Sequence, residues 1–194
     1  MRIWKILLVF ILFTGCREHY TPKPRGYFRI DFPEKNYHVL NGIYPYSFDV
    51  PDYAVIEKDD RNPNEKYWIN VDVPANKAEL HLSYYDLKNQ SKPTRELLFE
   101  LMEETRSLAY KHSIKADAID EKIFVNPGAK VYGTIYDIKG NAASPMQFFL
   151  TDSTSHFLRG ALYISEVPDI DSLRPVIDFL EPDIIRLIET TNWK

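Results

Sequence analysis

The chain has 194 residues, of which 44% are hydrophobic, and its 24 lysines and arginines against 28 aspartates and glutamates give a formal net charge of −4. That length is enough for one domain with a substantial core. The acidic balance argues against a nucleic-acid partner and against a broad electrostatic hold on anionic lipid. The chain contains one cysteine, so no disulfide can form within it.

The first fifteen residues have the order of a lipoprotein signal peptide. Met1–Lys5 carries two positive charges. The apolar run Ile6–Phe13 rises only about 12 Å as a helix, which is too short for a hydrocarbon core of roughly 30 Å. Small residues ending at Gly15 then precede Cys16. We expect cleavage between Gly15 and Cys16 and lipidation of Cys16; the alternative is a buried apolar strand with an incidental cysteine.

Residues 16–25 are interpreted as the lipidated N-terminus and a short linker. Arg17–Pro24 is polar and interrupted by proline, and eight residues reach at most about 28 Å when extended. Three acyl chains, the usual number on a mature bacterial lipoprotein, exceed the two signals that stable anchoring takes. A single domain at residues 26–194 would therefore stay close to its membrane.

The first half of that domain shows the alternation of strands. Apolar and polar residues alternate in four segments, which are Tyr27–Phe32, Tyr46–Val50 with 54–56 just beyond, Tyr67–Val73 and Ala78–Tyr84. The last two flank a short turn and form a predicted hairpin. The segment Asp59–Glu65, which comes just before the predicted strand Tyr67–Val73, is expected to be an exposed loop.

The second half contains two predicted helices around a meander. Thr94–His112 places its apolar residues on one helical stripe, and a second stripe begins near Ser172. Pro175 is expected in the first turn of the second helix, and Pro182 is expected to kink or split it. Between the helices, predicted antiparallel strands cover residues 119–125, 130–138, 146–151 and 156–164.

Strands, a helix, more strands and a final helix predict an α+β fold. The simplest arrangement is an antiparallel sheet of about six strands with both amphipathic helices packed on it. This order of elements resembles the fold shared by PsbP and Mog1. A fold of this kind does not determine function.

The sequence offers no convincing catalytic or metal-binding pattern. The five histidines lack zinc-site spacing. His112 is expected in the core or at a helix end, and His81, flanked by two leucines, is expected to point into solvent. Ser153 and His156 lie in a turn-rich run without a nucleophile elbow. We therefore predict no enzyme activity, no metal, no cofactor and no small-molecule substrate.

Aromatic residues make up 14% of the chain and form adjacent pairs on predicted strands. In such a pair one ring faces away from the core side of the sheet. If the helices cover one face only, several rings remain available to a partner or a glycan. If the helices cover both faces, the same rings belong to the core.

Three segments carry a resemblance to a known family. They are Pro24–Ile30 just after the cysteine, the block from Asn126 and Val131 to Tyr163, and the ending Ile188–Lys194. Together they resemble the GldD family of gliding-motility lipoproteins of Bacteroidetes over essentially the whole chain. The block from Val131 to Tyr163 is the most specific part.

The resemblance implies a non-enzymatic envelope lipoprotein required for gliding and for the linked type IX secretion system. Its partners would be other envelope proteins of that apparatus. The anchor favours the outer membrane with the domain facing the periplasm, because Arg17 and the two residues after it lack the acidic run of surface-exported lipoproteins. An alternative is a glycan-binding or envelope-remodelling lipoprotein. Candidate partner contacts are Tyr67, Trp68, Tyr84, Tyr85, Asn141 and Arg159.

Overall fold

A computed structural model describes residues 30–88 and 91–194, so the predicted signal peptide, Cys16 and the whole predicted linker lie outside the described residues. The described chain is α+β, as predicted. The strands are β1 (Tyr37–Val39), β2 (Tyr46–Ser47), β3 (Asp49–Pro51), β4 (Val55–Lys58), β5 (Ile69–Val73), β6 (Ala78–Asp86), β7 (Ala116–Asn126), β8 (Val131–Gly140), β9 (Met146–Thr151), β10 (His156–Ile164) and β11 (Asn192–Trp193). The helices are α2 (Thr94–Tyr110) and α3 (Ile170–Thr190), with 3-10 turns η1 (Pro74–Asn76) and η2 (Lys111–Ile114).

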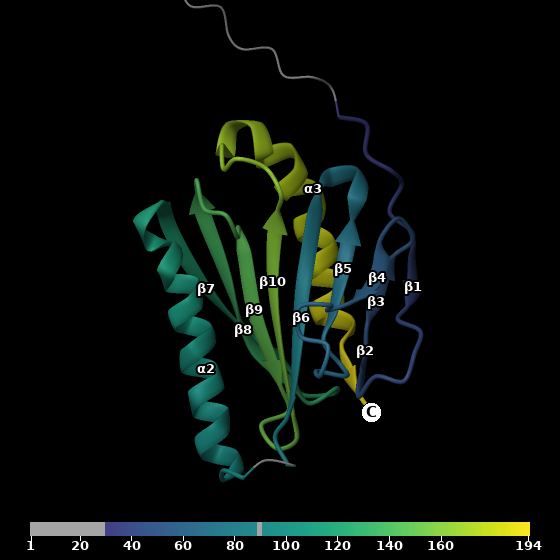
Figure 1. Cartoon of the computed structure of the whole chain (residues 1–194), viewed down its shortest axis with the longest axis vertical. Helices are drawn as coiled ribbons and strands as arrows, with labels where there is room; N and C mark the ends of the chain where they lie inside the picture. The colour runs from purple at the N-terminus through teal and green to yellow at the C-terminus, as the bar shows by residue number, and fades with distance from the viewer. Residues whose placement is uncertain (1–29, 89–90) are drawn as a thin grey trace, which may run out of the picture.

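One seven-stranded antiparallel sheet forms the centre of the molecule (Figure 1). Its strand order is β4-β5-β6-β10-β9-β8-β7. The predicted hairpin β5–β6 and the predicted meander β7–β10 are both present, and they join where β6 pairs with β10. The sheet has one strand more than the expected six or so. The segment Tyr46–Val50 lies outside it, because β2 pairs with β11 and β3 pairs with β1 in two small separate sheets.

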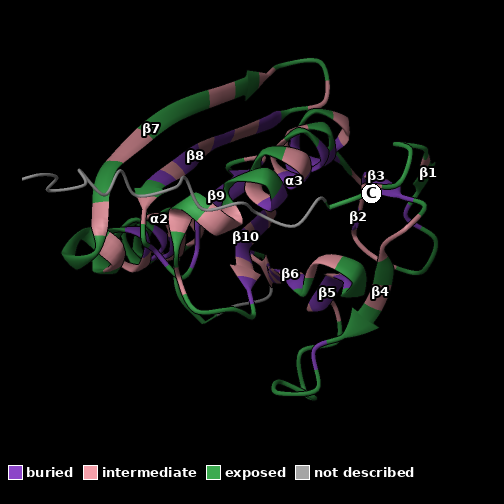
Figure 2. Ribbon diagram, turned by 90° about the horizontal axis from the view of Figure 1, so that it is seen from above, coloured by how far each residue is buried: buried purple, intermediate pink, exposed green. Residues whose placement is uncertain are grey.

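The two helices pack on opposite faces of this curved sheet (Figure 2). Helix α3 buries its apolar stripe against alternate residues of β5, β6, β9 and β10, in the larger core cluster. Helix α2 packs with Tyr136, Phe149 and Phe157 in a smaller cluster on the other face. The smaller cluster draws on β7, β8, β9, the start of β10 and the end of β6 at Tyr85, with Leu87 just after it. Helix α2 therefore leaves β5 and the rest of β6 uncovered on its face of the sheet.

Helix α2 ends two residues earlier than the predicted limit at His112. Leu101, Thr105 and Ala109, spaced four apart, are its buried residues, as one face of an amphipathic helix requires. From Lys111 the chain continues as the 3-10 turn η2, which tightens the end of the helix. His112 therefore lies at a helix end, which is one of the two places expected for it.

The prolines of α3 do not divide it. The helix is continuous from Ile170 to Thr190 and starts early enough that Pro175 falls beyond the first turn, contrary to the prediction. Pro182 lacks the N–H of a regular helical bond. The ammonium of Lys35 donates to the carbonyl of Phe179 in the turn before it. Packing of the stripe on both sides of Pro182 keeps the two halves in one helix.

The prediction of a strand at Tyr27–Phe32 is wrong for residues 30–32, the part of it that the structure describes. Residues 27–29 lie outside the described residues, and residues 30–36 have no regular secondary structure. The ring of Phe32 stacks on Phe179 of α3 with centroids 4.3 Å apart. The aromatic residue that suggested a strand instead fixes an irregular segment to a helix.

Candidate functional site

A cavity of about 420 Å³ opens on the sheet face that α3 does not cover. Its floor comes from β6 and β10, and its rim comes from Trp68 and the loop that follows β4. Side chains alternate across a strand. The odd-numbered residues of β6 therefore face the cavity, while Leu80, Leu82 and Tyr84 face the α3 core.

The strand register aligns the cavity's polar residues in rows. Ser83 of β6 pairs with Arg159 of β10, and Glu79 pairs with Tyr163. Between these rows His81 pairs with Asn70 on one side and with Ala161 on the other. Residues from three strands that are separate in sequence thus meet on one surface.

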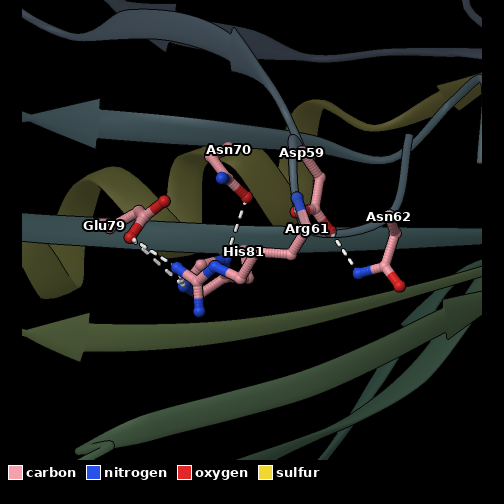
Figure 3. Close-up of polar contacts among 6 residues, drawn as sticks. All are labelled: Asp59, Arg61, Asn62, Asn70, Glu79 and His81. Carbon is pink, nitrogen blue, oxygen red and sulfur yellow. Dashed lines mark hydrogen bonds and ion pairs between the residues drawn. The ribbon is translucent and has the colours of Figure 1, made fainter.

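His81 is the centre of a hydrogen-bonded cluster (Figure 3). Its Nδ1 lies 2.9 Å from the side-chain oxygen of Asn70; an amide oxygen accepts, so Nδ1 donates. Its Nε2 lies 3.3 Å from Oε2 of Glu79 and 3.4 Å from Nη2 of Arg61. The side chain is 19% exposed, so the expectation that it points into solvent is wrong. The alternation of apolar and polar residues along β6 placed His81 on the correct face of the sheet. It could not show that the loop after β4 is folded over this face.

Burial lowers the pKa of His81, and the positive charges of Arg61 and Arg159 act in the same direction, against Glu79 and Asp59. Burial also lowers the pKa of His112 and of His156. The folded protein therefore favours neutral imidazoles, and the unfolded chain takes up protons first as the pH falls through the ordinary value of 6.5.

We accordingly expect the free energy of unfolding to decrease as the pH falls from about 7 to about 5. Urea denaturation across that range measures the slope. The variant His81→Gln should show a shallower slope, because it removes one of the three groups. An identical slope in this variant would show that His81 does not contribute.

The loop after β4 is folded over the cavity by Asp59. One oxygen of this carboxylate accepts the backbone N–H of Arg61 at 3.0 Å, and the other accepts the side-chain amide of Asn62 at 2.8 Å. Burial opposes ionisation, but these hydrogen bonds outweigh it and lower the pKa of Asp59. Asp59 is 7% exposed, which corrects the prediction that Asp59–Glu65 is exposed throughout.

Arg159 differs from the other charged groups of the cavity. Its Nε is buried and has no hydrogen-bond partner. Within residues 30–88 and 91–194 the structure gives its guanidinium no hydrogen bond and no ion pair, whereas Arg61 lies 3.4 Å from Glu79. A guanidinium carries five donors in a fixed planar arrangement. Arg159 therefore presents unused donors at a cavity wall.

Trp68 is fixed at the rim of the same cavity. Its indole N–H donates to the backbone carbonyl of Tyr84 at 2.8 Å. Its ring packs edge-to-face on Tyr85, with centroids 5.4 Å apart. These two contacts hold the indole in one orientation.

The structure brings together two of the six predicted contact residues, Trp68 and Arg159, in this cavity. Tyr85 lies behind Trp68 and packs against the α2 cluster. Tyr67 and Tyr84 contact each other on the α3 side of the sheet, with centroids 5.8 Å apart, and Tyr84 is buried.

Asn141, the sixth candidate, lies away from the cavity. Its side-chain oxygen accepts the backbone N–H of Ile170, which is the first residue of α3. Sequence reasoning missed Arg61, Glu79 and His81 as cavity residues. The alternation placed Glu79 and His81 on one face, but nothing in the sequence showed that β10 lies beside them.

Two further observations concern the described part of the chain. In that part, no three or more histidine, cysteine, aspartate or glutamate side chains are grouped so that they could hold a metal ion. Neither α2 nor α3, the helices described, is long and apolar enough to cross a membrane.

The family model described as gliding motility lipoprotein GldD matches residues 17–193. The solution structure of cyanobacterial PsbP from Synechocystis sp. PCC 6803 is similar with a TM-score of 0.49 and 9% sequence identity, over 84% of this chain and 95% of that chain. The comparison with curated proteins gave no match.

Proposed function

The chain belongs to the GldD family of gliding motility lipoproteins, and from this premise we propose that it is a non-enzymatic structural or assembly component of the gliding apparatus and of the linked type IX secretion system. The observation that carries the proposal is the extent of the family match, residues 17–193, which includes all the described residues except Lys194. Its partners in this proposal are other envelope proteins of the same apparatus.

The chemistry of the cavity supports a role without catalysis. The two nitrogens of His81 already face Asn70, Glu79 and Arg61. Ser83 lines the same cavity, but among the described residues it has no hydrogen bond to His81 that would activate it as a nucleophile. The carboxylate of Asp59 is engaged by its own loop. The contacts of these groups stabilise the wall of the cavity, which is a structural role that needs no catalytic group.

We place the domain on the periplasmic side of the outer membrane, held by lipid at Cys16. The first described residue, Ile30, lines one pocket together with Lys77 and Val176. The described chain begins at the end of the domain where the β5–β6 connection and the start of α3 lie (Figure 1). The thirteen residues from Arg17 to Arg29 that separate Cys16 from Ile30 reach at most about 47 Å when extended. That end of the domain is therefore the one we expect to face the bilayer.

The proposal is tested by deleting the gene and restoring it as wild type, as Cys16→Ala or as Arg17→Ala, a neighbouring control that leaves the lipidated residue intact. We expect the deletion strain to lose colony spreading and export of type IX cargo, and wild type and Arg17→Ala to restore both. Cys16→Ala should fold but leave the membrane fraction and restore neither. Normal spreading and secretion in the deletion strain would refute the proposed function, and membrane retention of Cys16→Ala would refute the anchor.

A further inference from the structure

The unpaired guanidinium of Arg159 indicates that the cavity receives an anionic group. Among the described residues its guanidinium has no hydrogen-bond or ion-pair partner, and it lines the cavity. A ligand carboxylate in the cavity would accept two parallel hydrogen bonds from the terminal N–H groups of this planar cation. Ser83 lies opposite Arg159 in the register of β6 and β10, and its side chain lines the same cavity. It can donate to the same anion.

The two carboxylates that line the cavity together with Arg159 already have other hydrogen-bond or ion-pair partners. Asp59 is bound by its own loop, and Glu79 lies between Arg61 and His81. These carboxylates still form part of the wall, so the cavity carries two positive and two negative side chains. Such a balance suits a ligand with a single negative charge, because a doubly charged phosphate would meet more repulsion from Glu79 and Asp59.

The remaining wall suits a polar ring. Trp68 presents a large indole that Tyr84 and Tyr85 hold in place, and such a ring offers apolar contact area at little cost in conformational entropy. Glu79 and the side chain of Asn62 line the same cavity and offer acceptors and donors. The hydroxyls of a sugar donate and accept in turn, whereas an acidic peptide side chain offers no donor to Glu79.

We propose that this cavity binds an acidic sugar, a uronic-acid-type residue of a glycan, with its carboxylate on Arg159, its ring against Trp68 and its hydroxyls toward Glu79 and Asn62. The volume of about 420 Å³ lies within the range of small-molecule sites. This binding activity goes beyond the proposed assembly role and does not depend on it.

The test is binding by the full-length lipoprotein in detergent, measured by calorimetry. The probes are oligomers of galacturonate and of glucuronate, a neutral glucose oligomer, glutarate, an aspartate-rich peptide and inorganic phosphate. We expect a uronate oligomer to bind at least about tenfold more tightly than any of the others. Arg159→Gln should weaken that binding by about 10- to 100-fold, the size of a charge-assisted hydrogen bond.

The matched control is Arg174→Gln, which removes an exposed arginine from α3. It should bind like wild type, and thermal melting should show that both variants are folded. If Arg159→Gln fails to fold, Ser83→Ala serves as the second variant and should weaken uronate binding while neutral oligomers stay unaffected. Equal binding of uronates and the neutral oligomer, tighter binding of peptide, glutarate or phosphate, or unchanged affinity in the folded variants would each overturn the proposal.

Discussion

Replacing Asp183 with alanine is expected to lower the free energy of unfolding by about 3 kcal/mol. This carboxylate on α3 is 5% exposed. It accepts hydrogen bonds from Lys35 at 2.8 Å, from the hydroxyl of Tyr37 at 2.5 Å and from the hydroxyl of Tyr53. Removing it leaves three donors without their partner, and it releases the segment before β4 from α3.

Urea denaturation measures the effect, and Asp178→Ala is the matched control because it removes an exposed aspartate from the same helix. The control should change the free energy of unfolding by less than about 0.5 kcal/mol. Burial and the hydrogen bond with Asp183 raise the pKa of Tyr37 to about 12. In Asp183→Asn this tyrosine should therefore ionise at a lower pH, which ultraviolet absorbance detects. Equal effects of Asp183→Ala and Asp178→Ala would contradict the role assigned to Asp183.

The sequence predicted most of the sheet because most of its strand pairs are local. The hairpin of β5 and β6 and the meander from β7 to β10 are each joined by short turns, and alternation identifies such strands reliably. The pairs that the sequence could not show are distant ones. β2 pairs with β11 at the other end of the chain, and β6 pairs with β10 across α2 and three strands.

Strand β1 and the pairing of β2 and β3 outside the main sheet were not predicted, for a related reason. Asp183 binds Lys35, Tyr37 and Tyr53 from more than a hundred residues away. Tertiary contacts of this kind, and not local alternation, decide the path of residues 30–53. A pattern such as Tyr27–Phe32 therefore suggested a strand where the chain forms an irregular segment on α3.

The candidate site was predictable only in pieces. Aromatic pairing indicated Trp68, and the family-like block contained Arg159, but the two are 91 positions apart and meet because β5, β6 and β10 are neighbours. The position of α2 also mattered. Helix α2 covers only one part of the sheet face opposite α3. It buries Phe149 and Phe157 there and leaves the strand residues around His81 and Glu79 uncovered. A helical stripe shows that a helix packs, but not which strands it covers.

The close approach of β8 and β9 at Gly133 leads to the second large prediction. A Cβ at this position would lie 2.0 Å from the backbone oxygen of Phe149 and 3.0 Å from Cδ2 of Leu150. The obstacle is backbone in the middle of the sheet, so no side-chain rotation relieves it. We expect Gly133→Ala to lower the free energy of unfolding by about 3 kcal/mol, at the upper end of the usual cost of overpacking.

Gly128→Ala is the matched control, since its Cβ would meet nothing closer than the side-chain oxygen of Asn126 at 3.5 Å. The same substitution there should leave the free energy of unfolding within about 0.5 kcal/mol of wild type or raise it slightly. Chemical denaturation of both variants gives the comparison, and amide hydrogen exchange of β8 and β9 should show faster exchange in Gly133→Ala alone. Wild-type stability in Gly133→Ala would mean that the two strands can separate without cost. The α3 core on one side of them and the α2 cluster on the other argue against that outcome, because Leu150 packs in the first and Phe149 in the second.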